Sequence, residues 1–220
     1  MTLVLACAAL GVVLAPLFDR AVDLVPALGR TPDEVVRYRA IPARLVVAAV
    51  VAAGAFAAMA ARFGAEPELV PYLLLVAALV PLALIDVEHH RLPDRLVFPA
   101  LAVSLPAIVV VSLVEGEPGA ILRALVGLVA YAGVLAAFAL ISPAGMGLGD
   151  VKLGLLLGLY LGWLDLYLVL LGLFLGSVLG AVMSLVVLGI TRDRRAHFPY
   201  GPNLCLGALV AIACSSQLLA

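Results

Sequence analysis

Long apolar stretches alternate with short polar ones along almost the whole chain. A helix needs about 20 apolar residues to cross the roughly 30 Å hydrocarbon core of a bilayer, and the pattern predicts a series of such helices. Their predicted ranges are 2–18, 45–61, 69–85, 96–114, 121–141, 151–162, 166–190 and 203–219. We therefore expect an all-α polytopic membrane protein with about eight transmembrane helices.

The sixth predicted helix is short, and only the segment GWLD at 162–165 separates it from the seventh. A turn at GWLD leaves Arg62 and Arg123 as the only basic residues on one face of the membrane. Because basic loops are retained in the cytoplasm, the other face is expected to be cytoplasmic and both termini to lie outside. That face then carries Arg20, Arg30, Arg37, Arg39, Arg44, Arg91, Arg95, Lys152, Arg192, Arg194 and Arg195.

Composition supports the same class of protein. The 220 residues are 65% hydrophobic and only 12% charged, and the mean hydropathy is +1.24. Soluble domains carry about 25% charged residues, so an integral membrane protein is indicated and the lipid bilayer is an expected partner. The net charge of −1 and the lack of a basic tail give no indication of nucleic-acid binding. Three cysteines without a CxxC pair argue against a zinc site or a disulfide framework, and we expect no cofactor.

No predicted loop is long enough to form a soluble domain, so residues 1–220 are expected to form a single integral membrane domain. The longest loop is predicted at 19–44. Within it, Thr31 and Glu34 have the spacing of a capping box, and Pro32 suits a first helical position. We expect this cytoplasmic loop to contain a short helix lying on the membrane surface.

Two aspartates stand at the edges of predicted helices. Asp86 follows the apolar run 79–85 directly, and Asp150 follows the segment GMGLG at 145–149. A charge at the membrane boundary is costly, so each one calls for a reason. By the distribution of basic residues, both carboxylates are expected at similar depth at the cytoplasmic face.

Paired carboxyl groups at one depth are what aspartic proteolysis requires. Two carboxyl groups a few ångströms apart share a proton, since both cannot ionise together. The ionised group then activates water, and the protonated group assists the peptide carbonyl and the leaving amine. The pair Asp86 and Asp150 is therefore our candidate for the catalytic residues.

Glycines before Asp150 allow two interpretations. In the first, the segment is a loop through which a peptide approaches the carboxylates, and it includes Gly145, Gly147, Gly149 and Lys152. The glycines have no side chains that would hinder this approach. Alternatively, Gly147 and Gly149 only form a turn, and Asp150 caps the following helix. Lys152 either anchors the helix at the interface or acts electrostatically on the carboxylates. The spacing alone leaves these alternatives open.

These residues carry a resemblance to a known family. The segment GMGLGDVKLG at 145–154 resembles the GxGD signature of polytopic aspartyl proteases, and its extended form resembles type IV prepilin peptidases. Two further segments resemble motifs of that family: an Asp followed six residues later by Leu-Pro-Asp, and a Pro-Tyr-Gly-Pro segment near the C-terminus. The matching residues are Asp86, Leu92, Pro93 and Asp94 in the first, and Pro199, Tyr200, Gly201 and Pro202 in the second.

The resemblance implies a membrane aspartyl endopeptidase that cleaves leader peptides from type IV prepilin or pseudopilin-like precursors. Its site would lie at the cytoplasmic face of a bacterial or archaeal inner membrane. Many members carry a tetracysteine zinc-binding insertion after the first helix, whereas the 19–44 loop contains no cysteine. We therefore do not expect the chain to methylate the new N-terminus of its product.

Several other polar or aromatic residues receive simpler interpretations. His89, His90 and Glu88 are expected in a solvated loop and not in a metal site. Adjacent histidines on a helix cannot both face one metal ion. Tyr160 and Trp163 are expected in the aromatic belt at the membrane interface. The glycines within 172–180 are expected to pack helices together.

Two alternative functions were weighed against the peptidase. A small transporter would use Asp86 and Asp150 to relay protons or cations. Transporters, however, more often place such groups at mid-membrane and contain internal repeats, and no convincing repeat is found here. A non-catalytic scaffold of a secretion apparatus would not need both aspartates.

Overall fold

The computed structural model describes residues 1–27, 42–141, 147–191 and 199–218. Within these ranges it contains eight helices and no strand, which confirms the all-α class. The helices are α1 (Thr2–Ala27), α2 (Pro42–Phe63), α3 (Leu69–His89), α4 (Asp94–Val114), α5 (Gly119–Ile141), α6 (Leu148–Leu164), α7 (Leu166–Thr191) and α8 (Gly201–Leu218).

Six of these helices are long and apolar enough to cross a membrane, namely α1 to α5 and α7. The helix α6 has only 17 residues, and the apolar part of α8 extends over Gly201–Ser215. The chain is thus a multi-pass membrane protein. Eight crossings, and the face on which the termini lie, stay predictions.

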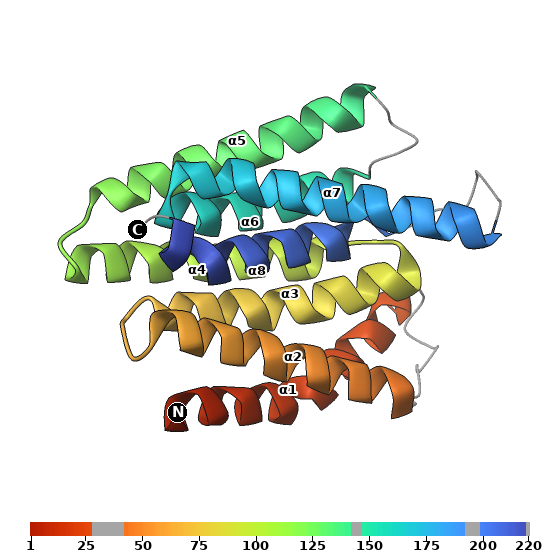
Figure 1. Cartoon of the computed structure of the whole chain (residues 1–220), viewed down its shortest axis with the longest axis horizontal. Coiled ribbons are helices and arrows are strands. Elements are labelled where there is room, and N and C mark those ends of the chain that lie inside the picture. Colours follow the sequence, from red (N-terminus) through yellow and green to blue (C-terminus); the bar gives the residue numbers. More distant parts are fainter. Residues whose placement is uncertain (28–41, 142–146, 192–198, 219–220) are drawn as a thin grey trace.

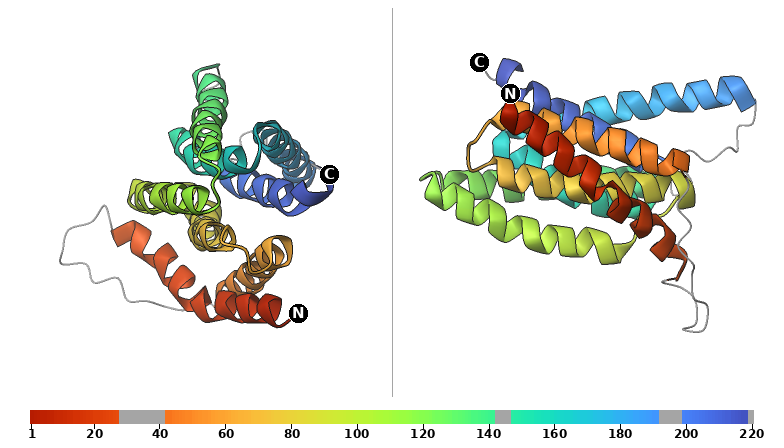
Figure 2. Two further views of the ribbon diagram at one scale, coloured as in Figure 1. Left: turned by 90° about the vertical axis from the view of Figure 1, so that its left-hand side faces the viewer. Right: turned by 90° about the horizontal axis from the view of Figure 1, so that it is seen from below.

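The helices run alongside one another, and successive helices point in opposite directions between the two ends of the bundle (Figure 1). α1 and α2 lie on one side, α5 to α7 on the other, and α3 and α8 between them (Figures 1 and 2). We call the end where α3 finishes and α4 begins the Asp86 end. We call the opposite end, where α1 begins and α8 ends, the Glu115 end.

The predicted loop at 19–44 is wrong in its boundaries. α1 continues through Ala27 and α2 already begins at Pro42. The helix can continue past Asp19 because this buried carboxylate forms an ion pair with Arg44 instead of standing alone in an apolar environment. The predicted surface helix with Thr31, Pro32 and Glu34 falls outside the described residues.

Glycines allow close contacts between helices. A Cβ atom added to Gly158 of α6 would lie 2.3 Å from the carbonyl oxygen of Gly127 on α5, so neither position has room for a side chain. The predicted packing role of the glycines within 172–180 is confirmed. A Cβ atom at Gly176 of α7 would lie 2.9 Å from Leu204 of α8.

The expectation of an aromatic belt at Tyr160 and Trp163 is wrong. Both side chains are buried inside the bundle. The Tyr160 hydroxyl donates to Ser104 Oγ at 2.8 Å, and the Trp163 indole donates to Ser112 Oγ at 2.8 Å. Partners on α4 satisfy their polar atoms, so these rings occupy the interior instead of the interface.

Candidate active site

Asp86 lies in the last turn of α3, since the helix continues to His89 instead of ending at residue 85 as predicted. Its side chain is only 6% exposed. The backbone N–H of Gly201, the first residue of α8, donates to Asp86 Oδ2 over 3.0 Å. A residue 115 positions later in the chain therefore holds this carboxylate in place.

The contact with Gly201 leaves no room for a side chain. A Cβ atom on Gly201 would lie 2.7 Å from Asp86 Oδ2. Sequence reasoning placed Gly201 in a family motif but did not predict that its backbone binds the carboxylate. No local signal in the sequence connects positions 86 and 201, because the contact arises only when α3 and α8 pack together.

Asp150 lies in the first turn of α6 and is 7% exposed. The backbone N–H of Gly147 donates to Asp150 Oδ2 at 3.3 Å, and the Asp150 N–H donates back to the Gly147 carbonyl at 3.1 Å. A carboxylate at the third helical position that reaches back in this way caps the helix. The capping role is thus present, and it leaves Asp150 buried at the Asp86 end of the bundle.

The Asp86 and Asp150 carboxyl groups are close enough for their charges to interact. Leu92 joins their surroundings. A Cβ atom on Gly149 would lie 3.0 Å from Leu92 Cβ, and one on Gly201 would lie 3.6 Å from Leu92 Cδ1. The three segments that resemble family motifs therefore meet around one side chain.

The remaining residues of the Asp86 segment and of the GxGD segment lie beside this pair. Pro93 has an extended backbone, and α4 begins at Asp94 instead of at residue 96 as predicted. Lys152 Nζ donates to Asp94 Oδ1 at 2.5 Å, so the starts of α6 and α4 are joined by an ion pair. Gly147 is exposed, whereas Gly149 is partly buried against Leu92. Gly145 lies outside the described residues.

The Pro-Tyr-Gly-Pro segment at 199–202 supports the start of α8. The Pro199 carbonyl accepts a hydrogen bond from Asn203 Nδ2 at 3.3 Å, and Pro202 lies in the first turn. The Tyr200 hydroxyl lies 3.1 Å from Ser177 Oγ of α7. These contacts fix the position of the Gly201 N–H that reaches Asp86.

The expected loop at Glu88 and His89 is wrong, because both residues belong to α3. Glu88 forms an ion pair with Arg44 at 2.9 Å, and His89 Nε2 lies 3.1 Å from the Val22 carbonyl oxygen. His90 ends the helix in a left-handed conformation. In the part of the chain that the structure describes, no three His, Cys, Asp or Glu side chains gather as a metal site would require.

The arrangement has the elements of acid–base chemistry on a peptide bond. Two largely buried carboxyl groups face each other's charge, and each accepts a backbone N–H from a glycine. Such a pair can hold one proton between them, which leaves one group able to accept a proton and the other able to donate one.

Comparisons with known proteins identify the family to which the chain belongs. Residues 73–185 match the model of the type IV leader peptidase family, a range that includes both aspartates but not the segment 199–202. The prepilin leader peptidase/N-methyltransferase of Stutzerimonas stutzeri is 35% identical over 161 residues, which cover 72% of this chain and 54% of the relative. The protein of the same name from Pseudomonas putida is 34% identical over the same shares of each chain.

A third relative with this name, from Legionella pneumophila, is 31% identical over 151 residues, or 69% of this chain and 52% of the relative. The chain thus spans about half the length of these curated relatives. No solved structure shows a significant match. The family match covers more than half of the chain and contains Asp86 and Asp150. The chain belongs to the type IV leader peptidase family.

Proposed function

We propose that the chain is an aspartyl endopeptidase that removes leader peptides from type IV prepilin or pseudopilin-like precursors. One observation carries the proposal: Asp86 and Asp150, 64 residues apart in sequence, come together at one end of the helix bundle with their carboxyl groups buried and interacting. Their position at the end of the bundle, instead of its middle, gives no support to the alternative of a transporter.

In the proposed reaction, the carboxylate that lacks the proton takes one from water, and the resulting hydroxide attacks the peptide carbonyl carbon. The protonated carboxyl group donates a hydrogen bond to the carbonyl oxygen. It then passes its proton to the leaving amine as the C–N bond breaks. The proton taken from water restores the shared proton, so the pair is ready for another substrate.

We propose that cleavage occurs at the cytoplasmic face of the inner membrane. The support is the distribution of basic residues, with eleven of thirteen Lys and Arg on the predicted cytoplasmic side. A substrate whose apolar helix already lies in the bilayer presents its cytoplasmic end at the depth of Asp86 and Asp150. Much of the entropy lost on positioning the scissile bond is then removed before binding.

The proposed substrate has a short basic leader, a small residue such as glycine before the scissile bond, and an apolar helix after it. Gly147 is exposed and lies beside the Asp150 carboxylate. A backbone without side chains at this point leaves room for a peptide to approach but little for a bulky residue. A precursor with a large residue in place of that glycine should be cut much more slowly.

We also propose that the reaction needs no metal and that the chain does not methylate its product. The relatives carry both activities in their names, but the 19–44 segment contains no tetracysteine module. The test is to supply purified protein with a prepilin, with and without chelator and S-adenosylmethionine. Loss of cleavage on chelation, or a 14-dalton gain on the mature product, would refute the corresponding half of this proposal.

The main experiment is co-expression with a candidate prepilin, followed by N-terminal sequencing of the product. The proposal expects a mature N-terminus immediately after the leader, and only the precursor in cells that lack the protein. Panels of prepilins and pseudopilins with different leaders would identify the preferred substrate. If none is shortened while the protein is present in the membrane, the proposed function is wrong.

A further inference from the structure

Arg44, in the first turn of α2, binds carboxylates from two other helices. Its guanidinium donates through Nε to Asp19 Oδ1, through Nη2 to Asp23 Oδ1 at 2.9 Å, and through Nη1 to Glu88. The bond to Glu88 is two-pronged, with distances of 2.9 Å to Oε2 and 3.2 Å to Oε1. One side chain thus joins α1, α2 and the end of α3.

The contact with Glu88 lies two residues beyond Asp86. Successive residues of an α-helix are turned by about 100°, so side chains two apart point in nearly opposite directions. Asp86 accordingly faces Gly201 of α8, while Glu88 faces Arg44 of α2. The last turn of α3 is held on both sides, since His89 also contacts the Val22 carbonyl of α1.

Arginine suits this place better than lysine. The side chain is only 9% exposed, and the Asp19 side chain is completely buried. Three carboxylates around one cation require several donors in fixed directions, which a planar guanidinium provides and a lysine ammonium does not. Arg44 also brings a positive charge to the buried Asp19, which lowers the cost of burying that carboxylate.

We infer that Arg44 is a positioning residue: it holds the end of α3 through Glu88 and thereby fixes where the Asp86 carboxyl group lies. The inference rests on the proposed peptidase function for its effect on activity. Arg44 lies outside the range matched by the family model, which begins at residue 73. The α1–α2 pair is then part of what makes the site, although it contributes no carboxyl group to the proposed catalytic pair.

The sharpest variant is Glu88→Gln. It removes the negative charge that attracts Arg44 to α3 but leaves Arg44 paired with Asp19 and Asp23, and Glu88 is 38% exposed, so the fold should tolerate the change. Misplacement of a reacting group by about 1 Å can cost on the order of a hundredfold in rate. We expect kcat to fall about ten- to a hundredfold, with KM within twofold of the wild-type value.

Arg44→Lys should lower kcat at least as much as Glu88→Gln, and the double variant should be no slower than Arg44→Lys alone. The matched control is Arg62→Gln at the other end of α2, where the arginine donates to Ser215 Oγ at 2.8 Å. This control should keep wild-type kcat. Equal kcat in Glu88→Gln and the wild type would overturn the positioning role, even if Arg44→Lys fails to accumulate.

A measurement without substrate separates this inference from the proposed function. Nitroxide labels at positions 47 and 87, both exposed valines on α2 and α3, would report the distance between these helices by pulsed electron paramagnetic resonance. Cys7, Cys205 and Cys214 would be replaced by alanine for this purpose. Glu88→Gln should broaden the distance distribution, whereas Arg62→Gln should not.

An unchanged distribution in Glu88→Gln would overturn the inference whatever the enzyme does. If Glu88→Gln broadens the distribution but the wild-type protein cleaves no prepilin, Arg44 still holds α3 and the peptidase function is refuted. Broadening together with the selective loss of kcat supports both.

Discussion

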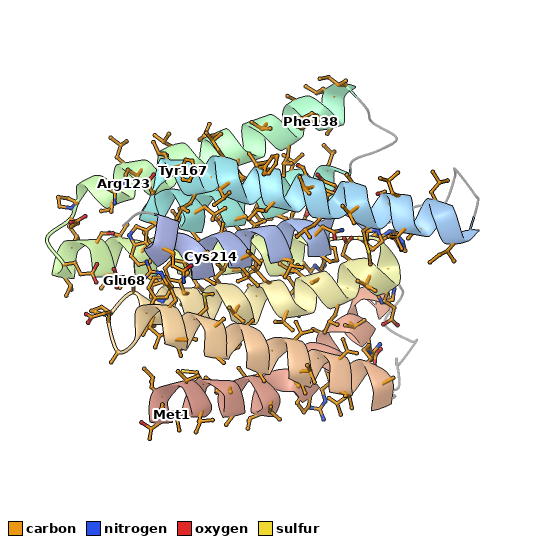
Figure 3. The ribbon with its side chains drawn as sticks, viewed as in Figure 1. Met1, Glu68, Arg123, Phe138, Tyr167 and Cys214 are labelled. Atoms are coloured by element: carbon orange, nitrogen blue, oxygen red, sulfur yellow. The ribbon has the colours of Figure 1, made fainter. Side chains whose placement is uncertain are left out.

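The carboxylates at the two ends of the bundle differ in the partners that they bind. At the Asp86 end, charged groups connect helices: Glu88 binds Arg44, Asp94 binds Lys152, and Asp86 accepts the N–H of Gly201. At the Glu115 end, acidic residues from two connections lie near one another, with Glu68 close to the α2–α3 turn (Figure 3). There the Arg123–Glu117 pair spans 3.9 Å and both side chains are largely exposed.

The difference shows at which end of the bundle ion pairs hold the helices together. Exposed ion pairs contribute about 0–1 kcal/mol, so the Glu115 end gains little from its charges. The Arg44 side chain is only 9% exposed and its ion pairs join three helices, so these pairs restrict geometry more strongly. The Asp86 end needs that restriction if Asp86 and Asp150 are to share a proton.

The largest expected effect follows the loss of either carboxyl group of the pair. Asp86→Asn and Asp150→Asn should each lower the rate of leader removal about a hundred- to ten-thousandfold, because an amide cannot exchange the proton. The measurement is the fraction of processed prepilin in membranes that contain equal amounts of each variant. Processing at the wild-type rate by either variant would rule out the pair.

A second prediction compares the two ends directly. A cysteine at position 94 should resist an impermeant thiol reagent added from outside the cell, whereas one at position 116 should react. The reason is that the basic residues predict a cytoplasmic Asp86 end. The exposed Cys214 must first be replaced. The reverse labelling pattern would overturn the orientation and the proposed side of cleavage.

A smaller effect is expected from Gly201→Ala. The added methyl group would lie 2.7 Å from Asp86 Oδ2, so either the carboxylate or the start of α8 must move. We expect kcat to fall at least about tenfold, on the scale of misplaced catalytic groups. Gly54→Ala is the matched control, because a Cβ atom there has no heavy atom within 4 Å. Equal rates for both variants would show that the Gly201 contact is dispensable.

The sequence was sufficient for the order of the helices, and it singled out two aspartates that the fold brings to one end of the bundle. Long apolar runs give helices wherever they occur, and a carboxylate next to such a run is conspicuous. The eight predicted ranges therefore correspond in order to α1 through α8. The boundaries failed where charge is neutralised by tertiary contacts, as with Asp19 and Glu88, both of which bind Arg44 inside or at the end of a helix.

Contacts between distant segments could not be predicted from a single sequence. The hydrogen bond between Gly201 and Asp86 has no local signal, whereas two other features had signals that were not used. Gly154, Gly158 and Gly162 repeat every four residues, which is the spacing of a close helix contact. The serines at 104 and 112 are polar residues in an apolar helix, which is the pattern expected if they bind buried side chains such as Tyr160 and Trp163.

The smallest expected effect concerns the Glu115 end. Slight desolvation, together with the nearby Glu68, Glu66 and Glu117, raises the pKa of Glu115 above its ordinary value. The folded protein then binds more protons than the unfolded chain over that pH range, so stability falls as pH rises through it. At neutral pH the charge on Glu115 costs stability, and Glu115→Gln should raise the thermal unfolding midpoint in detergent. Because the side chain is exposed and screened, the rise should be only about 1 °C.

The gain should disappear in acid, where Glu115 is protonated in both states. Glu117→Gln is the comparison variant and should gain less, because it also gives up the contact with Arg123. A gain that persists unchanged in acid would show that the Glu115 end is not under charge repulsion, and the contrast between the two ends would lose its basis.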